Sequence, residues 1–163
     1  MSWNGMCRKL EQEYLAECLR GRIQYFASTY RDCHDREGRA AIRLDGEEIL
    51  KGNYFNNYLY WKQFWPRYGD GYDCVDAQTL DCGAFDQRSL YKAFEAFDNQ
   101  SIDQSLQSDD LLVRIFALLD RRVGKRRLIA MRDEMKSAPE VLRKFYDIRM
   151  DAEGLADESG TPA

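Results

Sequence analysis

The feature that most constrains this chain is a change in hydrophobic period near residue 21. From residue 3 to residue 19, apolar side chains recur at three- and four-residue spacing, which is typical of an amphipathic helix. Ser2 is suited to cap the start of that helix, and Gly21 to end it. From residue 22 the spacing becomes two, which predicts a strand over 22–31.

Two further alternating runs follow this strand, over residues 39–44 and 47–51. They are separated by Asp45 and Gly46, a pair that favours a two-residue hairpin turn. The simplest arrangement is an antiparallel meander of three strands. We expect the N-terminal helix to cover the apolar face of this sheet.

Helical spacing returns at residue 85 and continues to the end of the domain. Ser101 and Gln104 form a capping-box pair for a short helix. Residues 109–124 predict a helix with acids at its start and basic residues in its last turn, in agreement with the helix dipole. Two more helices are predicted, over 125–136 and from Ser137, with Glu140 at the capping-box position. The predicted fold is therefore a single α+β domain over residues 1–155, with an N-terminal helix on a small antiparallel sheet, a C-terminal helical half, and a flexible tail at 156–163.

Composition limits the class of protein. A chain of 163 residues with 44% apolar side chains can bury a core, and a net charge of -4 with a pI near 5.1 argues against a surface built wholly for nucleic acid. Neither a signal-peptide pattern nor a membrane-spanning run is present, so we expect a cytoplasmic protein with no membrane association. Five cysteines without framework spacing are then expected to be free thiols.

The segment "YRDCHDREGR", residues 30–39, holds the only histidine of the chain and most resembles a chemical site. A structural zinc site needs four Cys or His ligands, and the chain has neither a second histidine nor a C-x-x-C pair, so we expect no metal. A Cys–His nucleophilic pair is equally unsupported, because neighbouring side chains on a strand point apart. Enzyme activity stays open and is the less favoured reading.

The favoured interpretation of this segment is a structured connection between strands. Aspartates close turns onto the backbone, Gly38 supplies a positive φ, and the flanking arginines form ion pairs. A recognition role for the loop stays open beside it. The candidate binding residues are Tyr30, Arg31, His34, Asp35 and Arg39.

A second candidate is "DRRVGKRR", residues 120–127, which carries five cations in seven residues: Arg121, Arg122, Lys125, Arg126 and Arg127. Clustered cations around a glycine can grip a phosphate backbone, although the segment is not a P-loop. The alternative is structural. Basic residues at a helix end complement its dipole, and nearby acids can neutralise them: Asp109, Asp110, Asp133 and Glu134.

Residues 54–68 carry eight aromatic side chains in 15 positions. Periodicity does not decide between helix and strand for this segment, although Pro66 must end it. Only two cations interleave with the aromatics, so a core or a protein interface is favoured over stacking on single-stranded bases.

The hairpin segment and the later "LLVRIFALLDRRVGKRRL" together resemble a family of short, functionally uncharacterised bacterial cytoplasmic proteins. The shared pattern is approximately Y-R-x-x-H-D-x-x-G-R-x-x-I-x-x-D-G-x-E-I, followed by D-R-R-x-G-K-R-x-L. The resemblance implies a bacterial source and a single domain, and it carries no activity. It includes His34 in the family pattern and leaves Cys33 out.

These observations favour a non-enzymatic protein that acts through protein–protein contacts, of accessory or immunity type. The alternative is a nucleic-acid or phosphate-ligand protein that uses residues 121–127. No cofactor is expected, and the chain is expected to be a monomer or a weak homodimer with an unknown protein partner.

Overall fold

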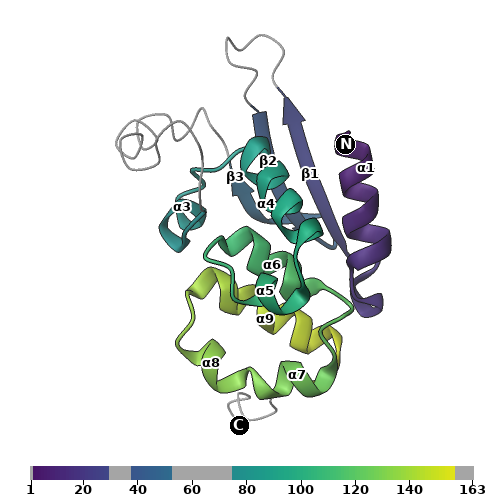
Figure 1. Ribbon diagram of the computed structural model, residues 1–163, viewed down its shortest axis with the longest axis vertical. Helices are drawn as coiled ribbons and strands as arrows, with labels where there is room; N and C mark the ends of the chain where they lie inside the picture. The colour runs from purple at the N-terminus through teal and green to yellow at the C-terminus, as the bar shows by residue number, and fades with distance from the viewer. Residues whose placement is uncertain (1, 30–37, 53–74, 157–163) are drawn as a thin grey trace.

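The computed structural model describes residues 2–29, 38–52 and 75–156. It shows an N-terminal helix, a three-stranded antiparallel sheet and a C-terminal helical half, so the predicted fold class is confirmed (Figure 1). The predictions for Tyr30 to Asp35, for the aromatic segment 54–68 and for the tail from residue 157 lie outside the described residues.

The sheet is the meander that the alternating pattern predicts. Strands β1 (Ile23–Thr29), β2 (Gly38–Leu44) and β3 (Glu47–Gly52) pair antiparallel in the order β1-β2-β3. Asp45 and Gly46 have φ values of 51° and 88°, as a type I′ hairpin turn requires. The hairpin prediction is therefore confirmed.

Gly38 is required for a different reason from the one expected. Its φ is not positive, but a Cβ at this position would lie 1.6 Å from the backbone oxygen of Ser28 on the paired strand. Any side chain would force β1 and β2 apart at the end of the hairpin. The expectation of a positive φ at Gly38 is wrong, and close backbone approach replaces it.

The N-terminal segment is not one helix. α1 (Trp3–Arg8) continues into a π-helix, η1 (Lys9–Tyr14), and after an extended break into a short 3₁₀ turn, η2 (Glu17–Leu19). Ser2 caps α1, as expected, through a hydrogen bond from the backbone N–H of Gly5.

The helix ends at Tyr14 because the next residues pair with a distant part of the chain. Leu15 forms an isolated β-bridge with Asp120, and the N–H of Ala16 donates to the carbonyl of Leu119 at 2.8 Å. These tertiary backbone bonds replace the helical ones, so the predicted helix over 3–19 is wrong in its last turn.

The C-terminal half consists of short helices that cover one face of the sheet and extend below it (Figure 1). α4 lies over the sheet, and α6 and α9 pack on each other beneath it. The bounds are α3 Ala77–Asp81, α4 Gln87–Asn99, α5 Ile102–Leu106, α6 Leu111–Leu119, α7 Lys125–Ala130, α8 Arg132–Lys136 and α9 Glu140–Ala152.

Three boundaries differ from the sequence prediction. α6 ends at Leu119, so the basic residues that follow are not in its last turn. The predicted helix over 125–136 breaks at Met131 into α7 and α8. α9 begins after Pro139 and not at Ser137, because the residue before a proline is disfavoured in the α conformation.

Aromatic side chains join the sheet to the helices. The rings of Tyr25 and Phe116 lie 5.5 Å apart, and those of Phe97 and Phe116 lie 5.7 Å apart, all in edge-to-face arrangement. The helical spacing predicted from residue 85 is confirmed in α4, which buries Leu90, Ala93, Phe94 and Phe97 on one face. The capping box of Ser101 and Gln104 is also present.

The partly buried carboxyl group of Asp110 makes the stability of the fold depend on pH. Its side chain caps α6 by accepting from the N–H of Leu112 at 2.9 Å, and burial raises its pKa from 3.8 to about 6. A carboxyl group whose pKa is raised on folding stabilises the fold most when protonated, and this contribution is lost as the pH rises through 6. Asp110→Asn keeps the capping oxygen without the charge. We expect it to be more stable at pH 7.5 by about 1–3 kcal/mol in urea unfolding.

The control is Asp133→Asn, which removes an exposed carboxylate whose pKa is lowered by the hydrogen bond from Lys136. This variant should not gain stability at pH 7.5. Asp110→Asn should gain less at pH 4.5 than at pH 7.5, and a loss of stability at pH 7.5 would contradict the account.

Candidate functional site: the basic junction

We call residues 121–127 the basic junction. They connect α6 to α7 at the lower end of the molecule (Figure 1), and Gly124 precedes the first residue of α7. The sequence predicts that their five cations act together. The structure instead separates them into cations that bind other parts of the chain and cations that do not.

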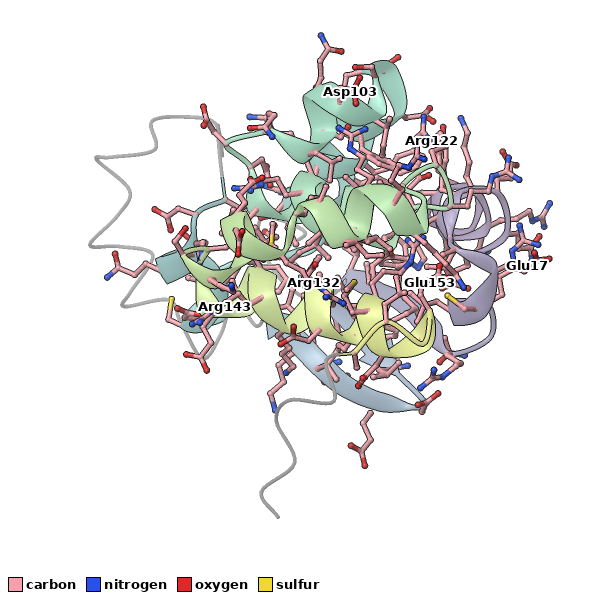
Figure 2. The ribbon with its side chains drawn as sticks, turned by 90° about the horizontal axis from the view of Figure 1, so that it is seen from below. Glu17, Asp103, Arg122, Arg132, Arg143 and Glu153 are labelled. Atoms are coloured by element: carbon pink, nitrogen blue, oxygen red, sulfur yellow. The ribbon has the colours of Figure 1, made fainter. Side chains whose placement is uncertain are left out.

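Arg122 belongs to the first group. Its Nη2 lies 2.8 Å from Oδ2 of Asp120, and the fully buried Asp120 carboxylate also accepts from the backbone N–H of Arg122 at 2.7 Å. The guanidinium lies over the rings of Tyr14 and Phe97, at 4.9 and 5.5 Å from their centroids. Figure 2 shows Arg122 beside the N-terminal segment. Arg122 therefore supplies the counter-charge of a buried carboxylate.

A residue that the sequence prediction missed holds the turn between α6 and α7 in place. Arg149 of α9 is 2% exposed and donates to the carbonyls of Leu118, Asp120 and Val123 at 3.0, 2.8 and 2.7 Å. Its Nε donates to Glu153 at 3.0 Å. The signal in the sequence is an arginine in the middle of the apolar stripe of α9, where a buried face would otherwise be continuous.

The N-terminal segment contributes a second polar cluster next to Arg122. Asp98 of α4 accepts a hydrogen bond from the hydroxyl of Tyr14 and lies 2.6 Å from Nζ of Lys9. Burial alone would raise the pKa of Asp98, but the hydrogen bonds from Lys9 and Tyr14 outweigh it and lower the pKa. This cluster joins η1 to α4 and leaves no uncompensated charge.

Arg127 is also paired, although weakly. Its Nη1 lies 2.5 Å from Oδ1 of Asp103 on α5, with both side chains largely exposed. A pair exposed to this degree contributes little stability.

The remaining cations of the junction, Arg121, Lys125 and Arg126, are exposed and form no ion pair within the described part of the chain. Ile129 lies one turn after Lys125 and Arg126 on the same side of α7, at 44% exposure. It is the only large apolar side chain exposed among the described residues. We call Lys125, Arg126 and Ile129, together with Arg121 in the turn before the helix, the α7 face.

The expected ion pairs within the chain are present for Arg122 and Arg127, although with Asp120 and Asp103, whereas the expected match to a helix dipole does not hold for Lys125 and Arg126. Lys125 and Arg126 lie in the first turn of α7, where the helix dipole is positive, so the dipole disfavours them by about 0.3–1 kcal/mol each. Three of the four acids expected to neutralise them have other partners: Asp133 pairs with Lys136, Glu134 with Arg114, and Asp110 caps α6. Within the described residues, the cations of the α7 face therefore form no ion pair.

Arg39, the one described residue of the hairpin candidate set, lies elsewhere. It is paired with Glu48 on β3, and its guanidinium carbon lies 5.5 Å from the ring centroid of Phe26. The start of β2 and α7 lie at opposite ends of the long axis (Figure 1). The structure therefore does not bring Arg39 and the basic junction together, and Tyr30, Arg31, His34 and Asp35 lie outside the described residues.

Metal and membrane chemistry have no support in the described ranges. No group of three or more His, Cys, Asp or Glu side chains there could hold a metal ion. No helix in these ranges is long and apolar enough to cross a bilayer.

The chain matches the model of the SF0329 protein family over residues 2–150. It belongs to the SF0329 protein family. The match runs from the N-terminal cap through the sheet and nearly to the end of α9, so this SF0329 family protein carries both candidate segments inside the family region. No curated protein and no solved structure matches the chain.

Because Arg122 is paired with a buried carboxylate and Arg126 has no ion pair among the described residues, we expect the two alanine variants to differ in stability. Arg122→Ala leaves Asp120 buried without its counter-charge, so we expect a loss of about 1–3 kcal/mol, less than for a fully buried pair because Arg122 is partly exposed. Arg126→Ala should change stability by less than about 0.5 kcal/mol. Urea unfolding of both variants at pH 7 tests this, and equal losses would contradict the division.

Proposed function

We propose that this SF0329 family protein is a non-enzymatic protein-binding protein, of accessory or immunity type, and that the α7 face receives an acidic surface of its partner. The observation that carries the proposal is the exposure of the side chains of Arg121, Lys125, Arg126 and Ile129, since none of the three cations has an ion-pair partner among the described residues. Residues that break a local rule without a compensating contact are expected at functional surfaces.

Ile129 favours a protein over a nucleic acid. An exposed isoleucine among cations gains from burial against an apolar side chain, and protein interfaces combine such an anchor with a charged rim. A phosphate backbone offers no matching apolar contact.

The alternative, phosphate-backbone binding by the whole junction, is weakened by the internal contacts of Arg122 and Arg127. Only three cations are free. The logarithm of affinity for duplex DNA would therefore fall with the logarithm of salt concentration with a slope of about -2.7 at most.

Self-association through the α7 face is disfavoured by its charge. A twofold interface places the same patch on both subunits, so cations would face cations. A partner with carboxylates around an apolar side chain fits the face better than a second copy does.

The test is site-specific photo-cross-linking in lysate of the source organism, with the photoreactive residue in place of Ile129. The control carries it in place of Gln24, an exposed residue of β1. We expect a defined protein adduct from position 129 that resists nuclease. Lys125→Glu with Arg126→Glu should reduce it at least tenfold, because both changes repel an acidic surface. Arg127→Glu, at the residue paired with Asp103, should reduce it less.

Two results would contradict the proposal. One is an adduct at position 129 no stronger than at position 24, or unaffected by the double charge reversal. The other is a nuclease-sensitive adduct together with salt-dependent DNA or RNA retardation that is lost in the same double variant. That second result would assign the junction to nucleic acid.

A further inference from the structure

A groove of about 1230 Å³ separates β3 from α9, and the end of α3 lies at one side of it. In Figure 2 α9 runs alongside the sheet, with Arg143 near its beginning and Glu153 close to its end. Apolar side chains line the groove from both walls, among them Ile49 and Leu50 of β3 and Val141 and Ile148 of α9. Basic and acidic side chains both occur among the lining residues, so net charge does not select a ligand.

The strand wall of this groove is a sheet edge. Among the described strands the order is β1-β2-β3, so β3 pairs on one side only. No described strand pairs with its other side, so among the described residues the backbone groups there form no ladder hydrogen bonds, as at an edge strand. A side chain of α9 binds one of these backbone groups: Nζ of Lys144 donates to the carbonyl of Ile49 at 2.9 Å.

Lys144 thus binds a backbone carbonyl that a fourth strand would need to reach. Lysines and irregular pairing are two common means of protecting an edge from unwanted strands, and the β2–β3 register is also irregular next to Ile42. Lys144 is exposed, so its ammonium group can leave the carbonyl for water at little cost. The edge is therefore protected by a group that a ligand can displace.

We propose that this groove binds an extended peptide segment of a partner protein, which pairs with β3 as a fourth strand and places alternate side chains on the apolar wall of α9. The six residues of β3 span about 20 Å, which matches a bound segment of about six residues. Backbone pairing then gives affinity, and the apolar lining gives preference for alternating apolar side chains. This site is separate from the α7 face and does not depend on it.

The test begins with selection from a random peptide library displayed on phage, against the full-length chain. A selected peptide is then added while amide hydrogen exchange is measured. We expect exchange in β3 to slow at least tenfold, because the peptide protects the free edge. Exchange in β1, the other edge of the sheet, is the internal control and should not change. Selection of no peptide, or binding without protection of β3, would overturn the proposal.

Variants separate edge pairing from simple surface charge. Lys144→Ala removes the group that competes for the Ile49 carbonyl, so peptide affinity should rise about twofold to tenfold. A loss of affinity would overturn edge pairing. Lys136→Ala, at an exposed lysine paired with Asp133, is the matched control and should leave affinity unchanged. Ile49→Arg should weaken binding at least tenfold, with its melting temperature measured in parallel.

A second copy of the chain is the competing occupant of the edge. Concentration-dependent dimerisation that protects β3 without any peptide would assign the edge to self-association and overturn the peptide proposal. Lys125→Glu with Arg126→Glu should leave peptide binding unchanged, so failure of this proposal and failure of the α7 face are distinguishable.

Discussion

The guanidinium of Arg149 is the interaction on which the lower half of the fold depends. It is buried and donates to the carbonyl of Leu118 at the end of α6 and to those of Asp120 and Val123 in the turn that follows, while Glu153 balances its charge. A helix end and turn that direct three carbonyls into a low-dielectric interior need such a donor, because each unsatisfied group is costly. The conformation of this turn places Asp120 beside Leu15, with which it forms a β-bridge. The position of the N-terminal segment therefore depends on Arg149, which lies near the C-terminus.

This arrangement explains why neighbouring cations have different roles. Arg122 is drawn inward by the buried carboxylate of Asp120, whereas Arg126 begins the next helix at the end where the dipole is positive. Charge spacing in the sequence cannot separate the two, since both lie in one basic run. Arg122 and Arg126 differ because the backbone turns between α6 and α7, and the hydrogen bonds from Arg149 hold this turn.

The sheet and most helix positions follow from local pattern, because alternation, the Asp45-Gly46 turn and the capping residues all act over a few residues. The errors lie where distant backbone segments meet. The N-terminal helix stops at Tyr14 because Leu15 pairs with Asp120, and no local feature of residues 3–19 reports that pairing. The groove beside β3 is likewise absent from the sequence pattern, because β3 and α9 are separated by more than 80 residues and meet only in the fold.

The dependence of the N-terminal segment on Arg149 is tested most directly by urea unfolding of Arg149→Met, together with amide exchange at Leu15 and Ala16. Methionine keeps the apolar stem and removes the donors, so the account predicts a loss of about 3–5 kcal/mol and faster exchange at Ala16, whose N–H donates to Leu119. Arg143→Met, on an exposed turn of the same helix, should change stability by less than about 0.5 kcal/mol. Equal stability of the two variants, or unchanged exchange at Ala16 in Arg149→Met, would contradict the account.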